Sequence, residues 1–144
     1  MATLFTKIIN GDVPGHFVYK DDAVVAFMTI APISDGHTLV VPRQEIDHWI
    51  DMPPDIASRV MEASLVVGKA IQKAFDPIKV GVMVAGLEVP HVHYHLVPVQ
   101  KISDLNFDLQ KADTPQESLS SAAAKIREAM RELGYEDRLE GCEG

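Results

Sequence analysis

Three histidines stand at every second position of one short segment, His91, His93 and His95, with apolar or aromatic residues between them. Successive side chains of a β-strand point to opposite faces, so a strand over 91–99 would gather the three imidazoles on one face. The residues between them would join the core. Near neutral pH an imidazole serves as a nucleophile, as a general acid or base, or as a metal ligand. The spacing therefore predicts a chemically active face.

Two other interpretations of these histidines have to be weighed. A half-exposed strand that carries three histidines by chance is disfavoured, because each ring needs partners for two nitrogens and neighbouring imidazolium charges repel. A zinc site built on His91 and His93 is the second alternative. The outer pair of a regular strand would lie roughly 13 Å apart at the Cα atoms, so a third ligand would have to come from elsewhere in the chain.

Hydrophobic periodicity predicts the elements that must hold these histidines. Runs rich in β-branched and aromatic residues predict five strands, at 17–19, 23–30, 37–41, 80–84 and 91–99. Apolar residues three and four apart predict a long central helix over 54–75 and a short N-terminal helix over 3–10. Hairpins followed by a helix and further strands indicate an α+β fold with an antiparallel sheet.

The C-terminal third of the chain predicts one more helix. Thr114-Pro115-Gln116-Glu117 has the order of a capping box with Pro at the first helical position, and helical spacing continues to Gly134. We expect a short helix over about 115–133 and a loose acidic tail over 135–144. The single cysteine, Cys142, falls in this tail and is given no role.

Size and charge limit the classes of function. A length of 144 residues predicts a single domain over 1–144. The net charge of −8, without a long run of Lys or Arg, argues against polymeric nucleic acid as a partner, although clustered imidazoles can still hold a small phosphorylated ligand. No stretch approaches the roughly 20 apolar residues of a membrane span, and the N-terminal residues lack an apolar run of signal-peptide length. We expect a cytoplasmic protein with no membrane partner.

The histidine segment resembles the signature of the histidine triad (HIT) family, in which three histidines alternate with apolar residues and two apolar residues follow. Residues 91–97 fit every position of this pattern. The segments 5–14, 18–22 and 36–42 are similar to the N-terminal half of the family, in the same order. The resemblance covers about residues 3–99 and is more specific than the triad pattern alone.

This resemblance implies a fold and a reaction. It implies a small α+β domain with a five-stranded antiparallel sheet, a homodimer, and a nucleotide hydrolase or transferase without a cofactor. His93 would attack the α-phosphorus of a purine nucleoside phosphoramidate or related nucleotide and form a nucleotidyl-histidine, which water then opens. His91 and His95 would donate N–H bonds to phosphate oxygens, one of them could protonate the leaving group, and His37 would support the cluster.

The resemblance also implies substrate-binding residues and shows departures from the family. The base and ribose would contact a set of apolar residues, Leu4, Phe5, Ile8, Phe27 and Ile30. Thr29 stands where many members carry an acidic residue that binds the ribose, and Leu87 and Glu88 replace polar residues before the triad. Some members bind a structural zinc through cysteines at the positions of Thr3 and Thr6 and a histidine at that of Glu45, so we expect no metal here. His16 and His48 match nothing catalytic.

The leading hypothesis is therefore a nucleoside phosphoramidase or nucleotidyl hydrolase that acts through His93. Because of the departures at Thr29, Leu87 and Glu88, a nucleotide-binding or interaction protein of the same fold with little turnover is the alternative. A metal-dependent hydrolase that uses His91 and His93 as ligands is a third possibility.

Overall fold

The computed structural model describes residues 2–142 and contains one five-stranded antiparallel sheet, as the sequence predicts. The order of the strands across the sheet is β1-β2-β3-β5-β4, so β1 and β4 form its edges. The strands are β1 (Phe17–Lys20), β2 (Val24–Met28), β3 (Thr38–Pro42), β4 (Lys79–Met83) and β5 (Tyr94–Val99). β2 and β3 are buried along their whole length, which explains their continuous apolar composition.

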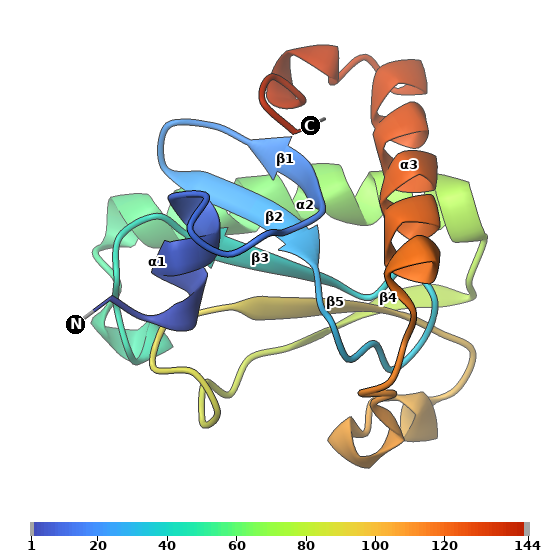
Figure 1. Ribbon diagram of the computed structural model, residues 1–144, viewed down its shortest axis with the longest axis horizontal. Helices are drawn as coiled ribbons and strands as arrows, with labels where there is room; N and C mark the ends of the chain where they lie inside the picture. The colour runs from blue at the N-terminus through green and yellow to red at the C-terminus, as the bar shows by residue number, and fades with distance from the viewer. Residues whose placement is uncertain (1, 143–144) are drawn as a thin grey trace.

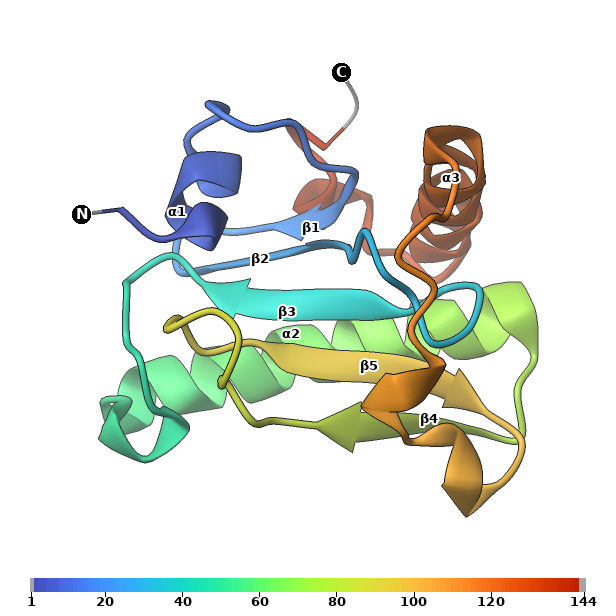
Figure 2. The same cartoon turned by 60° about the horizontal axis from the view of Figure 1, so that its bottom comes forward.

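Three α-helices pack around this sheet: α1 (Leu4–Ile9), α2 (Pro54–Phe75) and α3 (Gln116–Glu132). α2 crosses one face of the sheet against β2, β3 and β5, and α3 packs beside α2 and against β1 and β2. α1 lies on the face opposite α2 (Figures 1 and 2). The predicted helix over 54–75 is confirmed, and small or β-branched residues at helical spacing form its buried side: Val60, Ala63, Ser64, Val67, Ala70 and Ile71.

The strand predicted over 91–99 is shorter than expected and begins at Tyr94. The pairing of Val40 with Tyr94 would bring Pro42 opposite Val92 two residues further along the ladder. Pro42 has no N–H to donate, and the N–H of Val92 bonds instead to the carbonyl of Ile46 at 2.7 Å. His91 and His93 therefore lie before the strand, so the predicted start of the strand at residue 91 is wrong.

The expected capping box and loose tail are also wrong. Thr114 donates its hydroxyl to the carbonyl of Lys111 at 2.6 Å, and α3 begins at Gln116 without a side-chain cap. The tail is packed as far as Cys142, since Leu139 and Cys142 are both 7% exposed and belong to the core. Lys20 also donates to the carbonyl of Gly141 at 2.8 Å. These contacts attach the tail to β1, while residues 143–144 lie outside the described residues.

Within residues 2–142, none of the helices combines the length and the apolar character needed to cross a bilayer.

Candidate active site

Four buried histidines meet beside the central strands β3 and β5. His95 lies in β5 opposite Leu39 of β3, and His37 comes directly before β3. His37 and His91 are fully buried, whereas His93 is 5% exposed and His95 is 7% exposed. The rings of His93 and His95 are neighbours, with centroids 4.9 Å apart. The fold thus brings together all four histidines that the sequence singled out.

The hydrogen bonds of His37 determine which nitrogens of His37 and His95 carry protons. The N–H of Ile33 donates to Nδ1 of His37 at 2.9 Å, so the proton of a neutral His37 is on Nε2. This Nε2–H donates to Nδ1 of His95 at 2.9 Å, and His95 then carries its own proton on Nε2. Burial lowers the pKa of His37 to about 3 and that of His95 to about 4, with further lowering by neighbouring imidazoles. Both rings are neutral at pH 7.

His93 has the opposite tautomer. Its Nδ1 lies 2.7 Å from the backbone carbonyl oxygen of His91, which can only accept, so Nδ1 carries the proton and Nε2 holds a lone pair. Burial lowers the pKa of His93 and outweighs this hydrogen bond, which raises it. Among the described residues, buried side-chain nitrogens and oxygens all have hydrogen-bond partners. The unpartnered Nε2 atoms of His93 and His95 must therefore reach the surface.

His91 is arranged differently from the expectation. Its Nε2–H donates to the carbonyl oxygen of Pro42 at 2.7 Å, and its Nδ1 lies 2.7 Å from the hydroxyl oxygen of Thr3. A phosphate donor needs a free N–H, and both nitrogens of this fully buried ring are occupied. The ring of His91 therefore does not offer the N–H that its expected role as a phosphate donor requires. Its backbone carbonyl, which accepts from His93, is the part that contacts the reactive ring.

Two phenylalanines flank the His93–His95 pair. The ring of Phe5, in α1, meets that of His93 edge-on with centroids 4.8 Å apart, and Phe107 meets His95 in the same way at 4.8 Å. Phe107 lies in a 3₁₀ turn, Phe107–Leu109, that follows β5. Sequence reasoning missed Phe107, because an isolated 3₁₀ turn has no hydrophobic periodicity. Apolar rings on both sides keep this part of the site poorly hydrated.

The expected base- and ribose-binding residues do not form one exposed pocket. Phe5, Ile8 and Phe27 are buried members of the core. Thr29 is 7% exposed, and its hydroxyl oxygen accepts from the N–H of Ala31 at 3.2 Å. Two residues of the expected set are open to a ligand, namely Leu4, which is 45% exposed, and Ile30, which is 67% exposed.

The loop before the triad extends away from the core. Leu87 is 95% exposed, and Glu88 is exposed as well. The negative charge of Glu88 nevertheless contributes a small upward effect to the pKa of His93. This loop therefore exposes an apolar side chain and a carboxylate at the two positions where the family resemblance implies polar residues.

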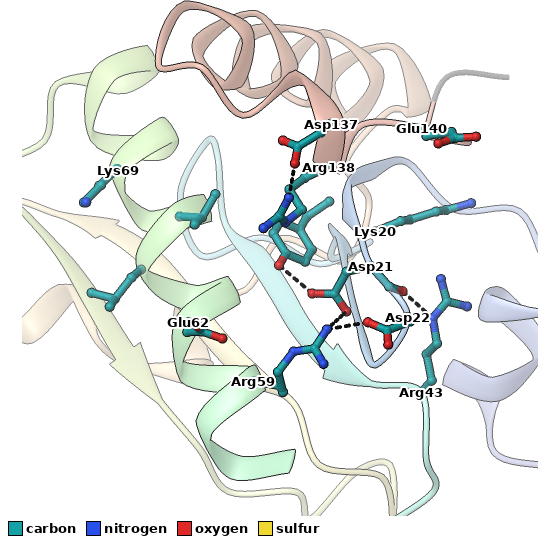
Figure 3. A pocket seen from close by; sticks show the side chains of 13 residues that line it. Lys20, Asp21, Asp22, Arg43, Arg59, Glu62, Lys69, Asp137, Arg138 and Glu140 are labelled. Atoms are coloured by element: carbon teal, nitrogen blue, oxygen red, sulfur yellow. Dashed lines mark hydrogen bonds and ion pairs between the residues drawn. The ribbon is translucent and has the colours of Figure 1, made fainter. Parts of the chain in front are cut away.

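A charged cleft of about 860 Å³ lies elsewhere on the molecule, between the β1–β2 turn, α2 and the C-terminal segment (Figure 3). Some of its charges are paired with one another, as between Arg59 and Asp21 at 3.3 Å. Asp21 also accepts from the Tyr19 hydroxyl at 2.6 Å and from two backbone N–H groups of the turn. Burial and this carboxylate raise the pKa of Tyr19 to about 12. The cleft contains a network that fastens the turn to α2, and none of the four buried histidines lines it.

Groups of three or more His, Cys, Asp or Glu side chains placed to hold a metal ion do not occur within residues 2–142.

Comparison with known proteins agrees with this geometry. Residues 10–102 match the family model described as HIT domain. An uncharacterised HIT-like protein of Methanocaldococcus jannaschii is 38% identical over 99 residues, which cover 66% of this chain and 77% of that protein. An adenosine 5′-monophosphoramidase of Saccharomyces cerevisiae is 29% identical over 98 residues, covering 67% of this chain and 62% of that protein.

A solved structure supports the same assignment. The crystal structure of a HIT-like protein from Bartonella henselae is similar with a TM-score of 0.77 and 33% identity, over 88% of this chain and 95% of that one. The matched residues 10–102 include His37 and the whole segment 91–97. The chain belongs to the HIT domain family.

Proposed function

We propose that this protein cleaves a purine nucleoside phosphoramidate, or a related nucleotide, at its α-phosphorus with His93 as the nucleophile. The observation that carries the proposal is the hydrogen bond from Nδ1–H of His93 to the carbonyl of His91. It leaves the lone pair on Nε2, the nitrogen that reaches the surface, and burial keeps the ring neutral. The similarity to the yeast adenosine 5′-monophosphoramidase supports a phosphoramidate as substrate.

The proposed reaction has two steps. In the first, the lone pair on Nε2 of His93 forms a bond to phosphorus while the bond from phosphorus to the leaving amine breaks, and the amine takes up a proton from water. In the second, a water oxygen bonds to the same phosphorus and the phosphorus–Nε2 bond breaks, which releases the nucleoside monophosphate and regenerates neutral His93. The proton that this water loses neutralises the hydroxide left when the amine was protonated in the first step.

His95 contributes a hydrogen bond to this reaction rather than a proton. With a pKa of about 4 the ring is neutral at pH 7, and a neutral imidazole gives up its remaining N–H proton only at very high pH. Its free Nε2–H can still donate to a phosphate oxygen as charge develops there. We therefore propose that water, and not a flanking histidine as the sequence suggested, protonates the leaving group.

Replacing His95 by alanine should lower kcat by roughly 10²- to 10³-fold, the usual effect of removing one donor to a transition-state oxyanion. The measurement is steady-state release of the nucleoside monophosphate. His16→Ala is the matched control, because His16 bonds to Gln116 outside the site and should keep the wild-type kcat. A wild-type rate for His95→Ala would remove His95 from the mechanism.

Adenosine 5′-phosphoramidate is the substrate that tests the proposed function. We expect the wild type to release adenosine monophosphate with multiple turnovers, and to do so equally well with a chelator present. Tight binding of the nucleotide without turnover would favour the alternative of a binding protein, which the exposed Leu87 and Glu88 motivate. Loss of turnover with the chelator, restored by zinc, would favour the metal-dependent alternative.

The base and ribose contacts are proposed at the exposed members of the expected set. Leu4 and Ile30 are the exposed members of the expected set, and Phe5 already lies against His93. Thr29 offers one hydroxyl, which the N–H of Ala31 already engages, so we propose a weaker ribose contact than a carboxylate makes.

A homodimer in the cytoplasm completes the proposal. β4 is an edge strand, and the neighbouring part of α2 exposes further apolar residues. Met61 and Leu65 of α2 are 48% and 55% exposed, Ile78 is 68% exposed, and Val82 of β4 is 48% exposed. Together they line one shallow hollow, and a second copy could cover it while pairing with the strand edge. The cytoplasmic location stays a prediction from the sequence.

Leu65→Glu should convert the dimer to a monomer, because the carboxylate would be buried without a partner in the interface. Sedimentation equilibrium at micromolar concentration should give twice 15.8 kDa for the wild type and 15.8 kDa for the variant. Leu133→Glu is the control and should remain dimeric, because Leu133 lies directly after α3, away from the proposed interface, and is 39% exposed. A wild type that sediments only as the 15.8 kDa species contradicts the proposed dimer.

A further inference from the structure

We infer that Thr3, Thr6 and Glu45 are positioning residues that hold the nucleophilic tautomer of His93 through His91. The inference rests on the proposed role of His93 as nucleophile. We call these three side chains the N-terminal clamp. Thr3 and Thr6 lie before residues 10–102, so they are outside the part of the chain that matches the family model.

Glu45 organises the clamp. One of its carboxylate oxygens accepts from the backbone N–H of Thr3 at 2.7 Å and from the hydroxyl of Thr6 at 2.6 Å. These bonds, the one from Thr6 first, lower the pKa of Glu45, so that the carboxylate stays charged at neutral pH. Thr3 also caps α1, since its hydroxyl oxygen accepts from the N–H of Thr6 at 3.2 Å.

The single hydroxyl proton of Thr3 is directed at Nδ1 of His91. The hydroxyl oxygen of Thr3 lies 2.7 Å from Nδ1 of His91 and 3.3 Å from the hydroxyl oxygen of Thr6, whose own proton goes to Glu45. Nε2 of His91 carries a proton because it faces the carbonyl of Pro42, so Nδ1 has to accept. Thr3 has one hydroxyl proton and is the donor toward both Nδ1 of His91 and the Thr6 oxygen, and the contact of 2.7 Å with His91 is the stronger of the two.

His91 transmits this constraint to the reactive ring. Its imidazole is fully buried and bonded at both nitrogens, so the ring cannot turn without leaving a buried nitrogen unsatisfied. The backbone carbonyl of the same residue accepts from Nδ1–H of His93 at 2.7 Å. Phe5, two residues after Thr3, contacts the rings of His91 and His93 with centroids at 5.8 and 4.8 Å. Loss of the Thr3 hydroxyl would weaken both contacts that hold the ring of His93, namely the hydrogen bond to the carbonyl of His91 and the ring contact with Phe5.

Thr3→Val tests the clamp because it keeps the shape of the side chain and removes the hydroxyl. We expect kcat to fall roughly 10-fold or more with KM changed less than threefold, since the misplaced group acts in the chemical step. Thr3→Ser restores the hydroxyl and should recover most of the wild-type kcat. Glu45→Ala should lower kcat in the same direction but less. Thr114→Val, which removes a hydroxyl from a distant loop, is the matched control and should leave kcat unchanged.

Nitrogen NMR of ¹⁵N-labelled histidine measures the same effect without turnover. In the wild type and in Thr3→Ser, the ring of His93 should be the Nδ1–H tautomer, whereas Thr3→Val should show a mixture with the Nε2–H tautomer. If the wild type turns over no nucleotide but this tautomer shift occurs, the proposed function fails and the clamp stands. A Thr3→Val protein that keeps both the wild-type tautomer and kcat within twofold overturns the clamp, as does a Thr3→Ser protein as impaired as Thr3→Val.

Discussion

His93→Ala should lower kcat by several orders of magnitude while nucleotide binding survives. The imidazole supplies the atom that forms the covalent bond to phosphorus, and of the four buried histidines His93 is the one that combines a neutral ring, an accessible nitrogen and a lone pair on that nitrogen. Binding should survive because the exposed residues proposed to contact the nucleotide, Leu4 and Ile30, are unchanged in the variant. The Kd of adenosine monophosphate, measured by calorimetry, should change less than tenfold.

Quenching the wild type with alkaline denaturant during turnover of phosphorus-labelled substrate should trap label on the protein. The bond between phosphorus and Nε2 of His93 must exist between the two steps, and it should survive alkali and break in acid. His93→Ala should trap none, whereas His95→Ala should still trap label, although more slowly. Full activity of His93→Ala on a substrate that the wild type cleaves would falsify the proposed mechanism.

The second large effect concerns stability in acid. The pKa of His37 is about 3 in the folded protein because the ring is buried, against an ordinary value of 6.5. Below 6.5 the unfolded chain takes up a proton that folded His37 refuses, so stability is fully present above pH 6.5 and is lost as the pH falls toward about 3. His37 alone should contribute a slope of about 1.4 kcal/mol per pH unit in this window. His95, with a pKa of about 4, should add to it.

His37→Gln isolates this contribution. A glutamine can accept from Ile33 and donate to His95 as the neutral imidazole does, but it does not titrate. Urea unfolding followed by circular dichroism at several pH values between 4 and 6.5 should show a slope shallower than that of the wild type by about 1.4 kcal/mol per pH unit. Thr114→Val, which changes no titratable group, is the control and should keep the wild-type slope. Equal slopes for the wild type and His37→Gln would mean that His37 is not held neutral by burial.

Patterns that repeat along the chain predicted the fold and the family well. The helix over 54–75 and the five strands follow from hydrophobic periodicity, which is a property of neighbouring residues. The segment 91–97 identified the family, because three imidazoles with apolar residues between them are rare without chemistry. The predictions were wrong where contacts with residues distant in the sequence outweighed the local sequence pattern. Leu139 and Cys142, in a tail that looks polar, are buried against the core.

The amino-acid sequence by itself determined the family, the sheet and the four histidines that meet beside it. Only the tertiary structure decided which nitrogen of each ring is free. Thr3 and Pro42 lie far along the chain from His91, as His37 does from His95, and the tautomers of His91 and His95 depend on which of these partners donates and which accepts. The period of a strand places a side chain on a face, but the state of an imidazole is set by its partners and its burial, which come from segments that meet only when the chain folds.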